Sequence, residues 1–100
     1  WLLWFDGWDA APELHRRCVE SWRLYNPDWT VRTISRRDLP VLLGSLNDSY
    51  ERMRVAMNAL EKFGGFWIPP AAESDLLRLM LLALYGGCWI DSTMVCRQPL

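Results

Sequence analysis

Hydrophobic and polar residues follow one another along this chain in a pattern that predicts alternating strands and helices. Residues 1–5 are a continuous apolar run with the length of a buried parallel strand, and residues 29–34 alternate like a half-buried strand. Between these runs, apolar residues recur at helical spacing among charged ones: Leu14, Cys18, Trp22 and Tyr25. This spacing predicts an amphipathic helix that packs on a sheet, with Pro12 in its first turn and Asn26-Pro27 at its end.

The middle of the chain predicts two more helices and a loop. Residues 39–43 are a short apolar stretch around Pro40. A longer amphipathic helix is marked by apolar residues at helical spacing: Tyr50, Met53, Met57 and Leu60. Asp48 and Glu51 have capping-box spacing at its start. Glycines and prolines predict a loop over 63–70, whose aromatic residues either line a site or dock the loop.

The stretch from Ser74 to Thr93 has the clearest pattern in the chain. Residues 76–84 are almost continuously apolar, which predicts a helix over 75–85 with Ser74 as its N-terminal cap. Gly86-Gly87 would end that helix, because glycine readily adopts the left-handed conformation of a C-cap. Residues 88–90 then predict a short buried strand that ends at Asp91.

This order of elements predicts that three charged residues converge. The helix would cover about 15 Å, and the returning strand about 10 Å, so Asp91 is expected to come back toward the start of the helix. Asp75 and Arg78 are spaced i, i+3 and share a helix face. In open α/β sheets, ligands bind at the carboxyl ends of the strands, so we expect a ligand site where these residues meet.

Composition narrows the class of protein. The chain has 100 residues, which is one small domain or part of a larger one, and its 51% hydrophobic content is enough for a core. A net charge of −1 argues against a nucleic-acid binder, and no apolar run has the length of a membrane span. The chain starts in a strand-like run without Met and stops soon after Asp91, so we expect a fragment of a longer protein.

The three cysteines lack the spacing of a zinc site and are expected to be buried, reduced thiols. No secretory signal is visible. The expected location is therefore the cytoplasm, either free or peripheral at a membrane.

Two parts of the sequence resemble a known enzyme family. The first is residues 74–93, SDLLRLMLLALYGGCWIDST, which resembles the nucleotide-sugar site of the capsular polysaccharide synthesis glycosyltransferases. These are related to the DXD-containing sugar transferases of the glycosyltransferase family 32 type. The second is the run WLLWFDGWDAAPEL with Cys18, Ser21 and Asn26-Pro27, which is similar to the start of the same family. The pattern SDxxR, spacer, YGGxWxD is specific, whereas the match over 39–66 is weak.

The resemblance implies a fold and an activity. The fold class is α/β, a GT-A, Rossmann-like α/β/α domain with a small, mostly parallel sheet, of which residues 1–100 are the donor-binding half. The activity is transfer of a sugar from a nucleotide sugar, with a UDP-sugar favoured, to a glycan or polysaccharide acceptor. We expect a transferase of the hexosyltransferase type. Its catalytic and acceptor-binding residues would lie beyond Leu100, so this stretch alone would be inactive.

The resemblance also implies these donor-binding residues: Trp4, Phe5, Gly7, Asp75, Arg78, Gly87 and Asp91. Trp4, Phe5 and Gly7 would lie near the uracil and ribose, because an aromatic ring stacks well on a flat base. Asp75 and Arg78 would contact sugar hydroxyls and the diphosphate, to which a planar guanidinium is suited. The alternatives are that Trp4 is a core residue and that Asp75–Arg78 is a surface ion pair worth about 0.3–0.5 kcal/mol.

A divalent metal belongs to the implied chemistry. A metal held between carboxylate and phosphate oxygens neutralises the charge that develops on the leaving diphosphate, and Mn²⁺ or Mg²⁺ suits hard oxygen ligands. In the resembled families an Asp-x-Asp motif stands at this strand end, and here it reads Asp91-Ser92-Thr93. Asp91 and Thr93 are therefore the candidate metal ligands, with the diphosphate supplying much of the coordination.

Other residues have simpler interpretations, and two other functions stay open. His15, the single histidine, is expected to be a solvated surface residue, and Arg36 and Arg37 a solvated turn. One alternative function is a non-catalytic nucleotide-sugar-binding module or degenerate transferase, which the missing second Asp favours. The other is a structural α/β fragment whose tryptophans cover a neighbouring domain.

Overall fold

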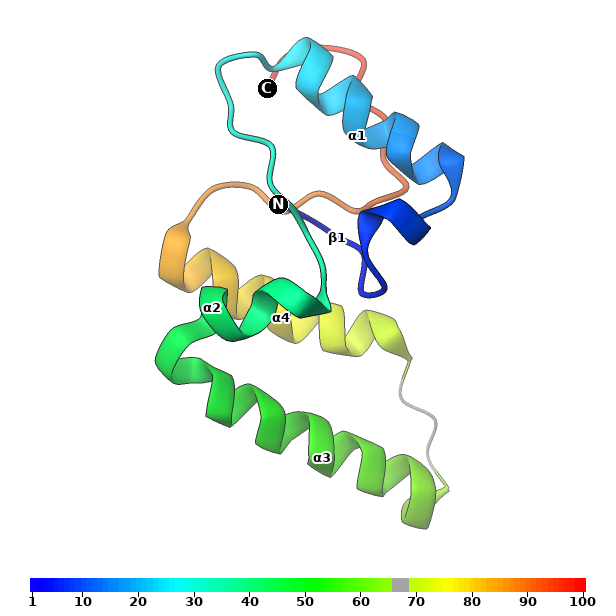
Figure 1. Ribbon diagram of the computed structural model, residues 1–100, viewed down its shortest axis with the longest axis vertical. Helices are drawn as coiled ribbons and strands as arrows, with labels where there is room; N and C mark the ends of the chain where they lie inside the picture. Colours follow the sequence, from blue (N-terminus) through cyan, green and yellow to red (C-terminus); the bar gives the residue numbers. More distant parts are fainter. Residues whose placement is uncertain (66–68) are drawn as a thin grey trace. The chain divides into compact units, whose positions relative to one another are not determined.

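Helices make up most of the described chain, which comprises residues 1–65 and 69–100 of a computed structural model (Figure 1). The chain divides into two units, one formed by residues 1–39 with 87–100 and the other by residues 40–86. The first unit holds a two-stranded parallel sheet, and the second consists of helices. Each unit is described by itself below.

The sheet of the first unit is parallel, as predicted, but its strands are short. Strand β1 (Leu2–Leu3) pairs with strand β2 (Thr33–Ile34), and Leu2 lies opposite Thr33. Pairing extends slightly beyond these residues, since the amide of Trp4 donates to Ile34 O at 3.0 Å. The predicted runs 1–5 and 29–34 are longer because turns take up their ends: Gly7 N donates to Trp4 O, and Trp29 N donates to Asn26 O, both at 3.1 Å.

The third predicted strand, at 88–90, is present as an extended segment without regular strand geometry. The amino group of Trp1 donates to Cys88 O at 2.9 Å, and Ile90 N donates to Trp1 O at 3.0 Å. These two bonds are the start of a parallel pairing. Consecutive residues of a strand direct their backbone groups to opposite edges, so Trp1 bonds to 88–90 on one edge while Leu2 bonds to Arg32 O on the other.

Helix α1 (Glu13–Tyr25) confirms the first predicted helix, with Pro12 and Asn26 at its two ends. Its buried residues pack with Leu2 and Cys96 into the core of the first unit, which is completed by partly buried side chains: Trp8, Val31 and Ile90. The buried positions are Cys18, Val19 and Trp22. Leu14 and Tyr25 were expected on this face but are 68% and 41% exposed, because the buried face is centred on the middle turns of the helix.

The cysteines are all free, and two of them are buried as predicted. Cys18 and Cys96 lie in the core of the first unit, each 4% exposed. Cys88 is exposed, because it lies directly after Gly87 on the extended segment. The expectation of three buried thiols is therefore wrong for Cys88.

Among its described residues, the second unit contains three α-helices: α2 (Leu39–Leu43), which begins at the last residue of the first unit, α3 (Asn47–Gly64) and α4 (Pro70–Tyr85). Helices α3 and α4 lie side by side in Figure 1. Tyr50 is 1% exposed, and Leu43, Leu77 and Leu81 are at most 2% exposed. All three helices were predicted, α3 from helical spacing and α2 and α4 from apolar runs, although Met53 and Leu60 on α3 are about half exposed, at 47% and 51%.

The predicted caps differ from the observed ones. Among the described residues no side chain caps α3, because the chain enters it from a 3₁₀ turn (Gly44–Leu46) that is already helical. A capping box occurs instead at a second 3₁₀ turn (Arg36–Asp38), where Asp38 Oδ2 accepts from both the amide (2.8 Å) and the hydroxyl (3.1 Å) of Ser35. This turn leads directly into α2.

Helix α4 begins five residues earlier than the predicted start at Asp75. Pro70 stands in its first turn, where the fixed φ of proline suits a helix and its missing amide costs nothing. Ser74 therefore lies inside the helix rather than capping it, and Asp75 and Arg78 lie on its middle turns.

The ends of α3 and α4 both use glycine. Gly65 follows α3 with a left-handed φ of 70° and ψ of 14°. Gly86 follows α4 with φ 71° and ψ −160°, a conformation open to glycine but different from the expected left-handed cap. The predicted loop at 63–70 is thus partly helical, and its aromatic residues at 66–68 lie outside the described residues.

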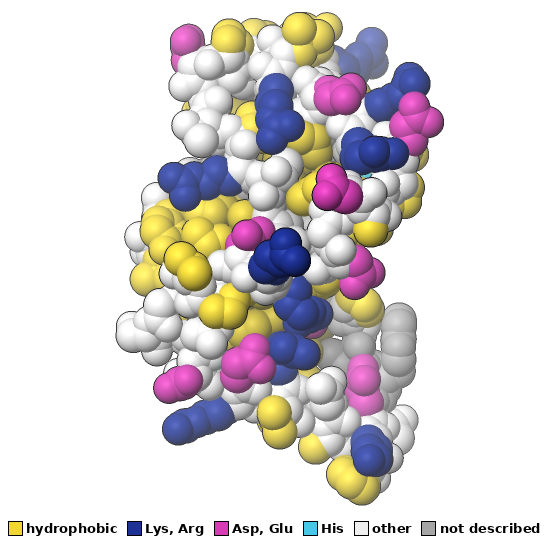
Figure 2. All heavy atoms as spheres, viewed as in Figure 1, with side chains coloured by type: hydrophobic (Ala, Val, Ile, Leu, Met, Phe, Trp, Pro, Cys, Tyr) yellow, Lys and Arg dark blue, Asp and Glu magenta, His cyan; other side chains and the backbone are white. Residues whose placement is uncertain are grey.

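The surface carries both signs of charge. In Figure 2, Lys and Arg side chains are interspersed with Asp and Glu on the visible face, as the net charge of −1 leads one to expect. Within residues 1–65 and 69–100, no helix combines the length and the apolar character needed to cross a membrane.

Candidate functional site

Trp4 occupies the carboxyl end of β1, where the sequence predicts a ligand. The turn after it is closed by Gly7, whose φ of 95° is readily adopted by glycine. The half-buried Trp4 ring lies 6.3 Å from the Trp8 ring and 4.6 Å from the His15 ring, measured between centroids. Trp4 is therefore held in an aromatic group at the strand end, and base stacking by Trp4 stays a prediction.

Phe5 lies at the same strand end under a positive charge. The guanidinium carbon of Arg36 is 4.5 Å from the centre of the Phe5 ring, and Arg36 N donates to Phe5 O at 3.1 Å. A cation over an aromatic face is attracted by the ring. Arg36 is thus packed on Phe5 rather than solvated in a turn, which corrects the expectation from the sequence.

The segment Asp91-Ser92-Thr93 forms a turn that Asp91 holds together. Asp91 Oδ1 accepts hydrogen bonds from the amide of Thr93 (3.0 Å) and from its hydroxyl (2.9 Å). The amide of Met94 donates to Asp91 O at 3.0 Å. The two candidate metal ligands therefore have their side-chain oxygens side by side on an exposed turn, which we call the Asp91 turn (91–93).

His15 connects the Asp91 turn to Trp4. Its Nδ1 lies 3.1 Å from Ser92 O, and its ring packs on Trp4. A carbonyl oxygen only accepts hydrogen bonds, so Nδ1 carries the proton and donates. The expectation of a solvated histidine is wrong, because His15 is partly buried and contacts two parts of the site. The sequence gives no signal for this role, since the partner is a backbone carbonyl 77 residues away.

Asp75 and Arg78 form an ion pair in the second unit. Arg78 Nη2 lies 3.1 Å from Asp75 Oδ1, and the side chains are 46% and 66% exposed, respectively. An exposed i, i+3 pair of this kind contributes at most about 1 kcal/mol. The pair belongs to residues 40–86 and Asp91 to the other unit, so the predicted convergence of the three residues stays a prediction.

Gly87 stands where the chain turns into the extended segment at 88–90. Its φ is 92°, and a Cβ at this position would lie 3.4 Å from Trp1 Nε1. A side chain here would strain the backbone, because L residues rarely adopt this φ, while its Cβ would meet Trp1 at van der Waals distance. Gly87 is therefore structurally required, and a contact to the donor stays a prediction.

Comparison with known proteins places the chain in a family. The sequence profile of the capsular polysaccharide synthesis protein family matches residues 1–100.

The chain belongs to this family.

Relatives of this capsular polysaccharide synthesis family member are named as glycosyltransferases. The O-glycosyltransferase PaGT of Phomopsis amygdali is 37% identical over 98 residues, which cover 91% of this chain and 22% of the relative. The glycosyltransferase afumC of Aspergillus fumigatus is 34% identical over 104 residues, which cover 100% of this chain and 25% of the relative. The O-glycosyltransferase braB of Annulohypoxylon truncatum is 32% identical over 97 residues, covering 92% and 22%.

The chain thus spans about a quarter of the length of these relatives or less. No solved structure gave a significant match.

The structure explains the residues near the start of the chain that carried the family resemblance. Ser21 and Asn26, with Trp22 between them, use their side chains to hold backbone groups of residues 94–100 along α1, where Figure 1 shows the C-terminal residues in red. The bonds run from Trp22 Nε1 to Met94 O (2.8 Å), from Cys96 N to Ser21 Oγ (2.9 Å) and from Leu100 N to Asn26 Oδ1 (2.7 Å). In this family member, α1 therefore fixes the chain that follows the Asp91 turn.

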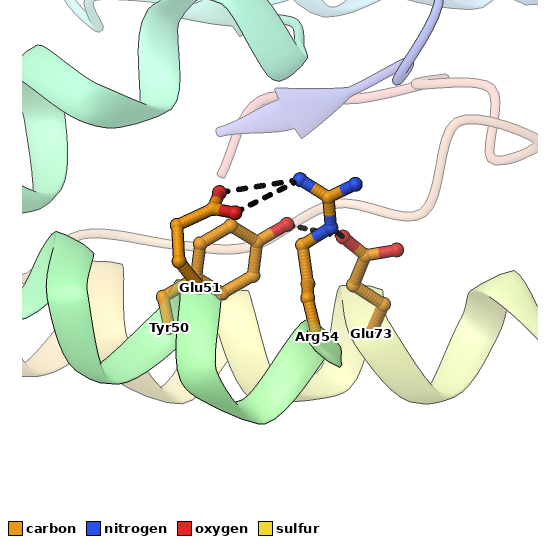
Figure 3. Close-up of polar contacts among 4 residues, drawn as sticks. All are labelled: Tyr50, Glu51, Arg54 and Glu73. Carbon is orange, nitrogen blue, oxygen red and sulfur yellow. Dashed lines mark hydrogen bonds and ion pairs between the residues drawn. The ribbon is translucent and has the colours of Figure 1, made fainter. Parts of the chain in front are cut away.

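The second unit contains a polar cluster that was not predicted from the sequence. Figure 3 shows Tyr50 and Arg54 of α3 pointing toward Glu73 of α4. The buried Tyr50 hydroxyl donates to Glu73 Oε1, and Arg54 Nε lies 3.6 Å from the same oxygen. Arg54 Nη1 also lies 3.2 Å from Glu51 Oε1. The Glu73 side chain is 15% exposed, so its contact with Tyr50 joins the two helices in a largely buried setting, whereas Glu51 is 48% exposed.

The donor atoms present suit a partial site for a hard cation. Across the described residues, no group of three or more His, Cys, Asp or Glu side chains could hold a metal. The Asp91 turn offers one carboxylate and one hydroxyl, both oxygen ligands of the kind that Mg²⁺ and Mn²⁺ prefer. Two oxygens are too few to complete the coordination shell of a divalent cation, so a metal bound here would need further ligands from elsewhere.

Proposed function

We propose that this chain is the donor-binding part of a glycosyltransferase. The enzyme would transfer a sugar from a UDP-sugar to a hydroxyl of a glycan or polysaccharide acceptor. One observation carries the proposal: the Asp91 turn is held at the end of the parallel pairing, tied through His15 to Trp4 at the end of β1. Carboxyl ends of parallel strands are where α/β folds bind ligands. Membership of the family and the names of the relatives support the same reaction class.

The proposed fold of the whole domain is of the GT-A, Rossmann-like type. Its support is the parallel pairing of β1 with β2 on one edge and with residues 88–90 on the other. Helix α1 follows β1 and packs its buried face into the same core. A parallel order of three segments with a crossover helix is the beginning of such a sheet.

In this proposal Mn²⁺ or Mg²⁺ binds at the Asp91 turn with the donor diphosphate, where the metal would neutralise the negative charge that the leaving group develops. Asp91 supplies the charged ligand. The Thr93 hydroxyl donates to Asp91 Oδ1 and keeps its lone pairs for a further contact. With one carboxylate instead of two, the chain binds metal weakly until the diphosphate arrives.

The proposed nucleoside contacts lie at the end of β1. Trp4 and Phe5 offer aromatic surface there, and Gly7 lets the backbone approach the ribose closely. Arg36 over Phe5 adds a positive charge at the same strand end, which favours an anionic ligand. Asp75 and Arg78 are proposed to contact the sugar and the diphosphate.

The second candidate function is a nucleotide-sugar-binding module without turnover. Thr93 in place of the second carboxylate favours it, because a neutral hydroxyl holds a divalent cation less strongly than a carboxylate does. The two functions differ in whether binding depends on the metal.

The test is titration of the full-length protein with UDP, with and without Mn²⁺, for the natural sequence, Asp91→Ala and Asp28→Ala. Asp28 is an exposed aspartate of the same unit and serves as the matched control. The proposal expects Mn²⁺-dependent binding that Asp91→Ala abolishes and Asp28→Ala leaves unchanged. Metal-independent binding would favour the binding module, and absence of binding by the folded natural protein would overturn both.

A further inference from the structure

Two kinds of hydrogen bond can be distinguished at the Asp91 turn: bonds within the turn and a bond to another element. The bonds from Thr93 to Asp91 Oδ1, and from Met94 N to Asp91 O, lie within the turn and fix its shape. They do not fix where the turn lies. Its place depends on bonds to other elements. Ile90 N donates to Trp1 O before the turn and Trp22 Nε1 donates to Met94 O after it, while His15 bonds within the turn, at Ser92 O between the two candidate metal ligands.

His15 is itself held in place. It lies in the first turns of α1, which is anchored in the core through Val19 and Trp22. Its ring packs on Trp4 with centroids 4.6 Å apart and planes tilted by 44°. A side chain with two rotatable bonds that is packed on a neighbouring ring loses little further freedom when it forms a hydrogen bond.

We propose that His15 is a positioning residue of the donor site: its Nδ1–H holds Ser92 O, and so sets the place of the Asp91 carboxylate and the Thr93 hydroxyl relative to Trp4. The proposal rests on the proposed function for the identity of the ligand. His15 touches neither donor nor metal in this role. It acts as histidine and carboxylate partners around metal ligands do, by orienting the groups that bind.

Two substitutions separate the hydrogen bond from the ring. His15→Asn keeps an N–H donor one bond beyond Cγ, where Nδ1 stands, but removes the ring. His15→Phe keeps a ring to pack on Trp4 but has no donor. His15→Gln is a further control, because its amide nitrogen lies one bond farther out and does not match the position of Nδ1.

The first measurement is amide hydrogen exchange in the full-length protein, which reports on the turn without any ligand. We expect exchange at Thr93 and Met94 to become about 5- to 10-fold faster in His15→Phe and His15→Gln, as loss of one hydrogen bond implies. In His15→Asn it stays close to the natural rate. The amides of Leu2 and Trp4, which bond to β2, show in the same experiment that the sheet is intact.

The second measurement is the affinity for UDP in the presence and absence of Mn²⁺. We expect His15→Phe to lose about 10-fold of the Mn²⁺-dependent affinity, with the metal-independent affinity unchanged and His15→Asn near the natural value. Equal loss in the Asn and Phe variants, or no change in either, would overturn the positioning role. If the natural protein binds no UDP with Mn²⁺, the proposed function fails, while the exchange rates still decide whether His15 holds the turn.

Discussion

At the scale of single residues, Thr93 stands where the resembled families have a second aspartate, and this replacement changes how the Asp91 carboxylate is held. A second carboxylate there would stand beside Asp91 Oδ1 and repel it, whereas the Thr93 hydroxyl donates to that oxygen at 2.9 Å. The carboxylate is thus oriented by a neutral neighbour. If a metal binds here as proposed, a neutral partner lowers the affinity of the free protein for that metal, while the hydrogen bond from Thr93 orients the carboxylate before the cation binds.

Replacing Thr93 tests this arrangement. Thr93→Val keeps the shape of the side chain but removes the hydroxyl, so the Asp91 carboxylate loses a bond worth about 1.5–3 kcal/mol to a charged group. We expect the Mn²⁺-dependent affinity of the full-length protein for UDP to fall about 10-fold, measured by calorimetric titration. Thr93→Ser, which keeps the hydroxyl, is the matched control and should bind like the natural protein. Equal affinities for the Val and Ser variants would contradict the role of the hydroxyl.

Residue identities named the candidate ligands of the Asp91 turn, whose role stays a prediction, but they did not indicate what packs around the turn. That Asp91 follows a short extended segment could be predicted from the sequence, although residues 88–90 lack regular strand geometry and are exposed or only partly buried. The roles of His15 and Trp22 could not, because each bonds to a backbone carbonyl, at Ser92 and Met94, and every residue has one. Contacts from a side chain to a distant main chain leave no pattern in a single sequence.

At the scale of elements, apolar spacing predicted α1, α2, α3 and α4, and the errors lie at their ends. Ser74-Asp75 reads as a helix start, yet Pro70 begins α4 and residues 71–73 continue it. The helix therefore starts at the proline, which suits a first turn and is followed by good helix formers, and not at the cap-like pattern of Ser74-Asp75. The observed strands are shorter than predicted, because residues with strand-like side chains belong to turns instead. These turns are closed by hydrogen bonds of Gly7 N and Asn26 O.

The contact between α3 and α4 gives a prediction about stability. Tyr50 is 1% exposed and its hydroxyl donates to Glu73, so Tyr50→Phe removes a bond to a charged group in a buried setting (Figure 3). We expect the free energy of unfolding to fall by about 1.5–3 kcal/mol, measured by urea denaturation. Tyr25→Phe, at a 41% exposed position of α1, is the control and should change stability by less than about 0.5 kcal/mol. A stability loss no larger than that of the control would show that the hydroxyl contributes nothing.

At the scale of the whole molecule, the sequence motif at residues 74–93 spans both units. Asp75 and Arg78 belong to one unit and Asp91 to the other, and Gly86-Gly87 is the link between them. Helix length and strand length alone predicted that the chain returns on itself. They do not determine the angle of that return, because it depends on the backbone conformation of two glycines, with φ of 71° and 92°, that sequence does not specify.

A double-mutant cycle tests whether both units serve one donor. If Arg78 and Asp91 contact the same UDP–Mn²⁺ complex, the losses of affinity in Arg78→Ala and in Asp91→Asn, which keeps a weaker neutral oxygen ligand, should not add in the double variant, with a coupling free energy above about 0.5 kcal/mol. Independent residues would add within about 0.3–0.5 kcal/mol. Arg52→Ala, at an exposed arginine of the same unit as Arg78, is the control and should leave UDP affinity unchanged.

The measurement is calorimetric titration of the full-length variants with UDP at saturating Mn²⁺. If both single variants weaken binding and their losses of binding free energy add in the double variant, the two residues act separately. If Arg78→Ala binds UDP like the natural protein, the Asp75–Arg78 pair is a surface ion pair, as its 66% and 46% exposure allows, or acts on the sugar alone. Repeating the titration with a UDP-sugar in place of UDP decides between these two. If Arg78 contacts the sugar, Arg78→Ala should bind the UDP-sugar more weakly than the natural protein does, and if the pair is only a surface ion pair, the two affinities should be equal.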